Sequence, residues 1–149
     1  SRTSNHYPLI AIAYDSRKDK FSKISRIFKG IHATGTTPEG LTFEAIMKEL
    51  VPGGINKDSY FLNFSDGMPM FHNDTMYYNG DEALKHTKKM TNKIRNMGVK
   101  VMSYYIGSSY ERDSSIRDFK KMYGKDAHFI NVTNVFEVAK TMNKMFLDK

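Results

Sequence analysis

Two short polar clusters in this sequence contain the residue types that bind a hard divalent cation. One is Gly35-Thr36-Thr37-Pro38, which leads into an amphipathic segment, and the other is Ser65-Asp66-Gly67, which follows an apolar run. Hydroxyl and carboxylate oxygens suit Mg²⁺, which keeps several of its own waters. Thr37 is a candidate ligand, and Asp66 is a candidate to bind the cation or one of its waters. In the structural alternative Thr37 caps a helix and Asp66-Gly67 makes a turn, and spacing alone favours this alternative.

The segment after Asp66 offers contacts for a protein partner. The methionines and the phenylalanine of Met68-Pro69-Met70-Phe71-His72 suit an adaptable partner surface, with partial burial as the alternative. His72 is expected in a surface loop, since no second histidine has metal-site spacing. Ser108, which follows a later apolar run, is expected to flank the same face. The candidate partner contacts are Met68, Met70, Phe71, His72 and Ser108.

No pattern typical of an enzyme accompanies these residues. The sequence has no Ser/His/Asp order in a nucleophile-elbow context, no Gly-x-x-x-x-Gly-Lys phosphate loop and no second carboxylate beside Asp66. We therefore expect a binding protein, with no catalytic residue.

Alternating strands and helices are expected to position these candidates. Apolar runs predict strands, and apolar residues at helical spacing predict helices. The predicted strands are Leu9–Tyr14, Tyr60–Phe64, Val99–Ile106 and His128–Val132. The predicted helices cover residues 24–31, 38–50, 83–97 and 115–123, and a last one begins at an Asn134 cap and buries Val135, Val138, Ala139, Met142, Met145 and Phe146. Residues 68–79 are expected to form a loop.

This alternation indicates an α/β fold: a doubly wound, mostly parallel sheet with helices on both faces, forming one domain over residues 1–149. Ligands of such sheets bind beyond the carboxyl ends of the strands, where both polar clusters are expected.

The charge and composition of the sequence indicate which class of partner and which cellular location to expect. The net charge is +7, but the lysines are spread over outer helix faces and no RNA-binding or Cys/His finger signature is present, so no specific nucleic-acid site is expected. No apolar run is long enough to cross a membrane, and residues 1–8 do not resemble a signal peptide. The absence of cysteine, and glycosylation triplets at Asn63 and Asn131 within predicted buried strands, favour a cytoplasmic location.

The order of these features resembles the von Willebrand factor type A family. The resemblance rests on Gly35-Thr36-Thr37-Pro38-Glu39-Gly40, on Phe64-Ser65-Asp66-Gly67 some thirty residues later, and on the run from Gly98 to Gly107. In style it is closest to intracellular bacterial and phage members, such as the cobalt-chelatase subunit type. The family's metal-ion-dependent adhesion site binds Mg²⁺ or Mn²⁺, and the resemblance implies that Thr37 (with Thr36 as a substitute) and Asp66 are ligands.

The remaining ligands of that site belong to an Asp-x-Ser-x-Ser motif that this chain lacks. Asp15-Ser16-Arg17-Lys18-Asp19 has the wrong spacing, and Asp113-Ser114-Ser115 comes too late in the order. Because Leu9–Tyr14 matches the family's second strand, the resemblance implies that the central first strand and helix are absent and that the domain is incomplete at its N-terminus. An upstream segment or a companion chain is expected to fill the gap.

The implied function is a metal-dependent protein-binding module, in which Mg²⁺ coordinates a partner carboxylate. The resemblance implies work alongside an AAA+ ATPase. The alternatives are a non-catalytic subunit of a metal chelatase and a metal-free structural scaffold.

Overall fold

The computed structural model describes residues 9–30, 32, 35–50, 52, 58–107, 113–131, 136, 139–140, 143 and 147. These residues form an α/β fold, as the sequence predicts. In chain order the elements are α1 (Ser22–Phe28), α2 (Glu39–Ile46), η1 (Met47–Glu49), β1 (Ser59–Ser65), β2 (Phe71–His72), β3 (Tyr77–Tyr78), α3 (Gly80–Asn96), β4 (Val99–Gly107), α4 (Asp113–Tyr123), η2 (Gly124–Asp126) and β5 (Ala127–Asn131). No helix among them combines the length and apolar character needed to cross a membrane.

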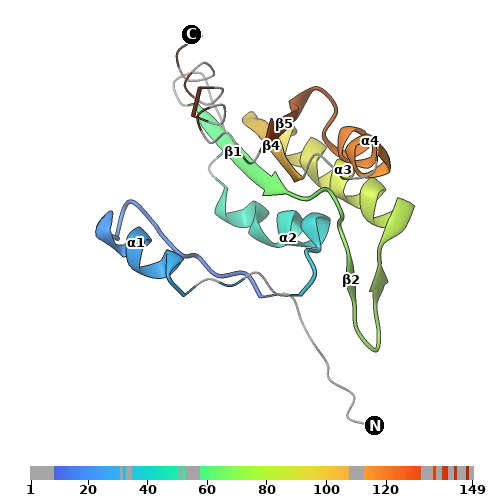
Figure 1. The fold of residues 1–149 in the computed structure, drawn as a ribbon, viewed down its shortest axis with the longest axis horizontal. Helices are drawn as coiled ribbons and strands as arrows, with labels where there is room; N and C mark the ends of the chain where they lie inside the picture. Colours follow the sequence, from blue (N-terminus) through green and yellow to red (C-terminus); the bar gives the residue numbers. More distant parts are fainter. Residues whose placement is uncertain are drawn as a thin grey trace.

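The main sheet has three parallel strands in the order β1-β4-β5 (Figure 1). Asn63 of β1 lies opposite Ser103 of β4, and Tyr105 of β4 lies opposite Phe129 of β5. Since the strands are parallel, the loops that follow β1 and β4 leave the sheet at the same edge. We call this the carboxyl edge.

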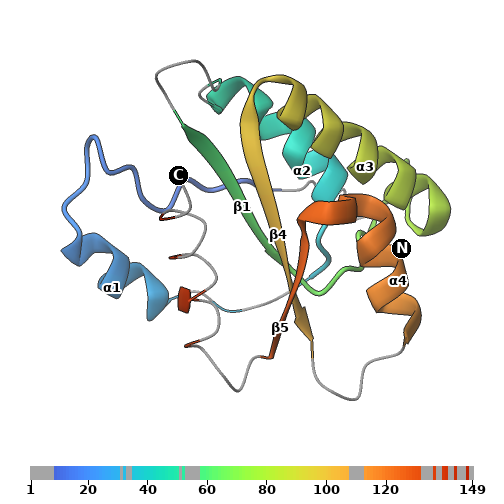
Figure 2. The same ribbon diagram turned by 90° about the horizontal axis from the view of Figure 1, so that it is seen from above.

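Helices α2, α3 and α4 pack on one face of this sheet (Figure 2). Their core is a cluster of apolar and aromatic side chains centred on Phe119, whose ring lies 4.7 Å from that of Tyr123 and 5.3 Å from that of Tyr105. Phe43 of α2 joins the cluster with an edge-on contact to Phe61, at 5.0 Å. On the opposite face, the buried ring of Tyr104 stacks on Phe64 at 5.1 Å.

Six predicted elements, those corresponding to α2, β1, α3, β4, α4 and β5, lie where the sequence analysis placed them, and the predicted helix over residues 24–31 is present as the shorter α1. The predicted strand Leu9–Tyr14 is wrong. These residues have no regular secondary structure, and Leu9 and Ile12 are 91% and 70% exposed. A strand is stabilised by its neighbours' hydrogen bonds and by burial, and this segment has neither burial nor ladder pairing. Helix α1 likewise lies apart, beyond β1 and away from α3 and α4 (Figures 1 and 2).

The prediction of helices on both faces of the sheet is confirmed for one face. The described helices that pack on the sheet, α2, α3 and α4, all lie on that face. In the region of the last predicted helix, residues 136, 139, 140, 143 and 147 are helical, and most of the rest, with the Asn134 cap, lies outside the described residues. Ala139, which was predicted to be buried, is exposed.

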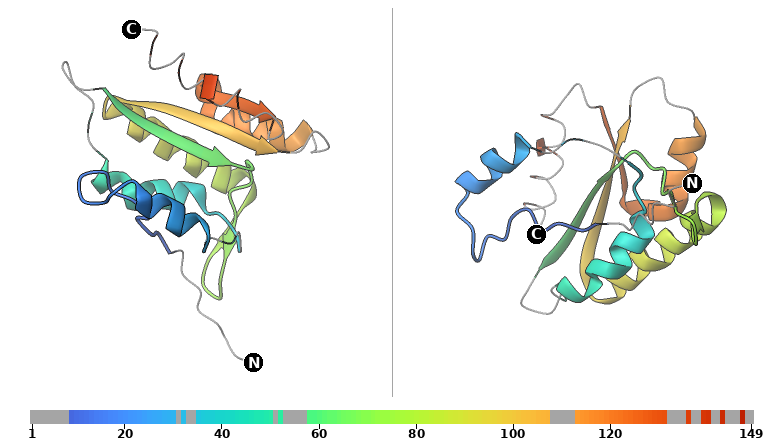
Figure 3. Two further views of the ribbon diagram at one scale, coloured as in Figure 1. Left: turned by 60° about the vertical axis from the view of Figure 1, so that its left-hand side comes forward. Right: turned by 90° about the horizontal axis from the view of Figure 1, so that it is seen from below.

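The segment from Met68 to Asn79, predicted to be a loop, contains a short antiparallel hairpin. Phe71 of β2 pairs with Tyr78 of β3, and both side chains are buried against Ala83 of α3. This anchor lets the hairpin extend away from the sheet (Figure 3). His72 and Tyr77 point outward from the same two strands.

Candidate functional site

The two predicted metal-binding clusters lie side by side at the carboxyl edge. The backbone N–H of Met70 donates to the carbonyl oxygen of Thr37 at 3.1 Å, which joins the loop before α2 to the loop after β1. The side chains of Thr37 and Asp66 are both exposed. Thr37 is not the N-cap that was predicted, because Pro38 occupies that position and Glu39 begins the helix.

Asp66 forms the turn that was considered as its structural role. Its Oδ1 accepts a hydrogen bond from the backbone N–H of Met68 at 3.2 Å, and Ser65 Oγ accepts one from Gly67 N–H at 2.9 Å. Gly67 has a φ of +77°, and a Cβ there would lie 3.0 Å from the Tyr105 ring. The turn therefore requires glycine both for its backbone conformation and for its fit against Tyr105.

The part of the chain that the structure describes contains no cluster of histidine and carboxylate side chains typical of a metal site. No three His, Asp or Glu side chains of that part come together in a way that could hold a metal ion. His72 is exposed on β2. Thr37 and Asp66 can therefore supply at most part of a coordination sphere.

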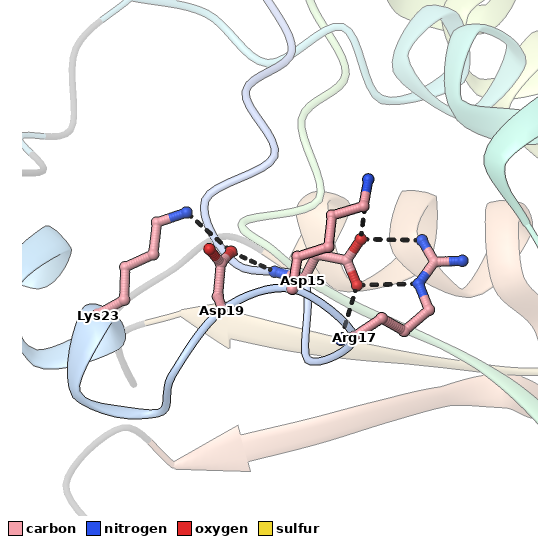
Figure 4. A network of polar contacts seen from close by, with 5 residues as sticks. Asp15, Arg17, Asp19 and Lys23 are labelled. Carbon is pink, nitrogen blue, oxygen red and sulfur yellow. Dashed lines mark hydrogen bonds and ion pairs between the residues drawn. The ribbon is translucent and has the colours of Figure 1, made fainter.

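The Asp15 to Asp19 segment has a different role, shown in Figure 4. Asp15 accepts hydrogen bonds from Nε and Nη2 of Arg17, each at 2.9 Å, and Asp19 accepts one from Lys23 Nζ at 2.8 Å. The Asp15 backbone N–H also donates to Asp19 Oδ2 at 2.9 Å. The Arg17 side-chain hydrogen bonds hold the pKa of Asp15 well below its ordinary value. Both carboxylates are thus engaged by neighbouring cations.

Glu39 is a buried acid that the sequence analysis did not single out. It is 2% exposed, and its Oε1 accepts a hydrogen bond from Asn63 Nδ2 at 3.2 Å, while Oε2 has no hydrogen-bond partner. Close packing of α2 on α3 buries it: a Cβ on Gly40 would clash with the Tyr78 hydroxyl and lie 2.8 Å from His86 Nδ1. A signal was present, because Glu39 precedes the buried Phe43 by four residues, one helical turn.

Burial raises the pKa of Glu39, and the nearby polar side chains of Ser65, Asn63 and Tyr123 oppose this shift. The Tyr123 hydroxyl accepts a hydrogen bond from Asn63 Nδ2 at 3.0 Å, and burial, together with the neighbouring Glu39 charge, raises the pKa of Tyr123. Such a cluster favours neutral forms of both acids. It links α2, β1 and α4 directly beneath the carboxyl edge.

The predicted partner contacts fall into three groups. Met68 and Met70 are exposed, at 60% and 36%, and so is His72. Phe71 is 7% exposed and anchors the hairpin, so of the two alternatives for this side chain the structure agrees with burial. Ser108 lies outside the described residues.

The start of α4, which the sequence analysis set aside because of chain order, adjoins the candidate site. Ser114 and Ser115 line a hollow together with Gly67 and Met68 from the Asp66 loop. The same hollow reaches the first residue of α3, Gly80. The start of α4 therefore joins the two loops that carry the predicted ligands at this edge of the sheet.

Comparison of the chain with protein-family models, with curated proteins and with solved structures found no match in any of the three. The resemblance to the von Willebrand factor type A family therefore rests on the motifs of the sequence itself.

Proposed function

We propose that this chain is a protein-binding module that engages its partner at the carboxyl edge, with Mg²⁺ held there in part by Thr37 and Asp66. The observation that supports this most directly is the backbone hydrogen bond between Met70 and Thr37. It keeps the two candidate ligand loops together, although their motifs are about thirty residues apart in the sequence.

The donor set fits Mg²⁺ chemically. Mg²⁺ is commonly held by one or two carboxylates and keeps several waters, so a hydroxyl and a carboxylate are suitable contributions. Only Oδ1 of Asp66 is used by the turn to Met68, and a carboxylate has a second oxygen able to act as a ligand. An upstream segment or a companion chain would supply the other protein ligands in this proposal, as the family resemblance implies.

A bound Mg²⁺ would supply a positive charge with a position open to a carboxylate of the partner. This chain's residues would orient that partner: the turn at Gly67 fixes the direction of Asp66, and the exposed Met68 and Met70 offer apolar contact. The family resemblance favours an AAA+ ATPase as the partner, inside the cell.

A metal-free scaffold is the second candidate function, and one observation favours it. Asp66 already has a structural role, because its Oδ1 accepts the Met68 N–H and so builds the turn. In this case the same edge would bind its partner without a cation.

Titration with Mn²⁺, monitored through the loss of the electron paramagnetic resonance signal of the free ion, distinguishes these two functions. Asp66→Asn keeps an oxygen acceptor for Met68 N–H but removes the charge, and Thr37→Val removes the hydroxyl. We expect the wild-type chain to bind Mn²⁺ weakly, since it holds only part of the proposed site, and each variant to bind more weakly still, by about tenfold or more for Asp66→Asn. Asp74→Asn, an exposed aspartate in the hairpin turn, is the matched control. Equal binding by wild type and Asp66→Asn would favour the metal-free scaffold.

A further inference from the structure

A hollow of about 270 Å³ lies at the carboxyl edge between the Asp66 loop, the start of α3 and the start of α4. Its apolar wall includes Met68, Met70 and Leu84, and its polar wall includes Ser115 and Asp118. Met68 and Met70 are also exposed to solvent, so a flexible, apolar rim leads into the hollow. Methionine side chains adapt to the shape of a partner, which suits an opening for an apolar side chain.

The surroundings of this hollow are mainly acidic, although the chain carries a net charge of +7. Asp118 lines it, and three exposed acids are next in the chain to a lining residue: Asp66 to Gly67, Asp81 to Gly80 and Asp113 to Ser114. Among the described residues, the cations next in the chain to a lining residue are Arg117, beside Asp118, and Lys85, which faces the separate lysine surface described below. Lys121 Nζ is paired with Asp118 Oδ1 at 2.8 Å. The hydrogen bond that Lys121 donates to Asp118, with a smaller contribution from the charge of Asp81, raises the pKa of Lys121. Asp81 and Asp118 thus act on the same side chain, across α3 and α4.

The basic residues of α3 gather elsewhere. Lys85, Lys88, Lys89 and Lys93 line a separate, more open surface further along the helix. Charge is therefore divided along α3, with acids at its first turn beside the hollow and lysines beyond.

We infer that this hollow binds an apolar side chain flanked by lysine or arginine, presented by a segment of a partner protein. The apolar side chain would enter between Met68, Met70 and Leu84, and the flanking cations would lie against Asp81, Asp113 and Asp118. This inference deepens the proposed function and rests on it in one respect, namely that the partner is a protein. It does not require a metal ion at Thr37 and Asp66. Charge complementarity favours this class of partner, because an acidic segment would meet the like charges of Asp81, Asp113 and Asp118.

Selection of random twelve-residue peptides displayed on phage, carried out on the full chain, tests this inference. We expect the enriched peptides to place Leu, Met or Phe beside Lys or Arg. Ser115→Trp fills the hollow and is expected to weaken binding of the best peptide by at least tenfold. Ser114→Trp is a second variant, at an exposed lining position, in case Ser115→Trp does not fold. Ser25→Trp, exposed on α1, is the matched control and should bind like wild type.

A charge-matched pair of double variants tests the acidic rim. Asp81→Asn/Asp113→Asn should weaken binding of the same peptide by about two- to thirtyfold, as for the loss of two exposed ion pairs. Glu44→Gln/Glu49→Gln changes the net charge equally but at exposed positions on α2 and η1, and should leave the affinity unchanged. Added salt should reduce the difference between the two double variants.

Three outcomes would overturn the inference: no enrichment, enrichment of acidic peptides, or equal affinity of the wild type and both tryptophan variants of the hollow. Repeating the measurement in Mg²⁺ and in EDTA separates this inference from the proposed cation site. Basic peptides that bind equally in EDTA support the hollow and count against the Mg²⁺ mechanism. Binding that needs Mg²⁺ but is insensitive to Ser115→Trp and Ser114→Trp supports the Mg²⁺ mechanism and overturns the role of the hollow.

Discussion

Replacing Glu39 by glutamine is expected to stabilise this protein at neutral and alkaline pH. Glu39 is 2% exposed, its described hydrogen bond comes from the neutral amide of Asn63, and its Oε2 has no hydrogen-bond partner. Glutamine has nearly the same shape but no charge. It preserves an acceptor for Asn63 while removing the need to bury a carboxylate.

The size of the effect follows from these contacts. An unsatisfied buried polar group reduces stability by about 1–3 kcal/mol, and a charged group by more. The amide of glutamine also leaves a polar group at the Oε2 position, so the gain is the difference between burying a charged and a neutral group. We expect Glu39→Gln to raise the free energy of unfolding by about 1–3 kcal/mol at pH 8. For a chain of this length, each kcal/mol corresponds to roughly 2–4 °C in Tm.

The stabilisation by Glu39→Gln is expected to increase with pH. Burial raises the pKa of Glu39 in the folded chain above its unfolded value, which is about 4.3 for a free side chain. The folded chain thus holds a proton that the unfolded chain loses, so stability is greatest below the unfolded pKa and falls as pH rises toward the folded pKa. The advantage of Glu39→Gln should be near zero at pH 4 and grow above it.

Urea unfolding followed by circular dichroism at pH 4 to 9 measures this, since the chain has no tryptophan to report by fluorescence. Glu49→Gln, at an exposed position in η1, is the control and should change the unfolding free energy by less than about 0.5 kcal/mol at every pH. The reasoning is refuted if Glu39→Gln is no more stable than wild type at pH 8, or if its advantage is the same at pH 4.

Two further predictions concern how the carboxyl edge and its supporting helices are held. Gly67→Ala should reduce the free energy of unfolding by about 1–3 kcal/mol, because Gly67 has a positive φ and its added Cβ would lie 3.0 Å from Tyr105. Gly35→Ala should reduce it by less, because Gly35 has a φ of +81° but no atom lies within 4 Å of an added Cβ. Equal effects of the two variants in thermal melts would contradict the packing argument. Arg95→Lys should reduce the free energy of unfolding, measured in urea, by about 1–3 kcal/mol. Lysine cannot form hydrogen bonds to Asp126, Asn92 and the Tyr123 carbonyl at the same time, as Arg95 does. Arg117→Lys, at an exposed position, is the control and should have little effect.

The sheet and its covering helices could be predicted from sequence because local and tertiary preferences agree there. The apolar runs that predicted β1, β4 and β5 are flanked by glycine and polar stops, and α3 shows its buried face in the spacing of Ala83, Met90 and Ile94. The parallel arrangement follows from the helices between the strands.

The Leu9–Tyr14 segment shows where this agreement fails. Its composition favours a strand, but strand propensity measures fit to a pleated, half-buried surface. Leu9 and Ile12 are largely exposed here, so these side chains do not pack on such a surface. The sequence can indicate that a segment is suited to a sheet, but it does not show whether a neighbouring strand is available to it.

The hairpin was missed although a signal was present. Phe71 and His72, then Tyr77 and Tyr78, alternate between buried and exposed positions, and Asn73 makes the turn by accepting hydrogen bonds from the N–H groups of Thr75 and Met76. Strands of two residues are too short for the periodicity to stand out from a loop.

The order of motifs along the chain was the least reliable guide to the site. Asp113-Ser114-Ser115 was set aside because it comes late, yet position in the sequence does not decide which loops meet at the edge of a parallel sheet. The chain leaves β1 and β4 at that edge, and the start of α4 lies beside the loop after β1, whatever the order of the motifs. Ser115 and Met68, far apart in the chain, line the same hollow for this reason. Motif order can suggest a family, but topology determines which residues can act on one ligand.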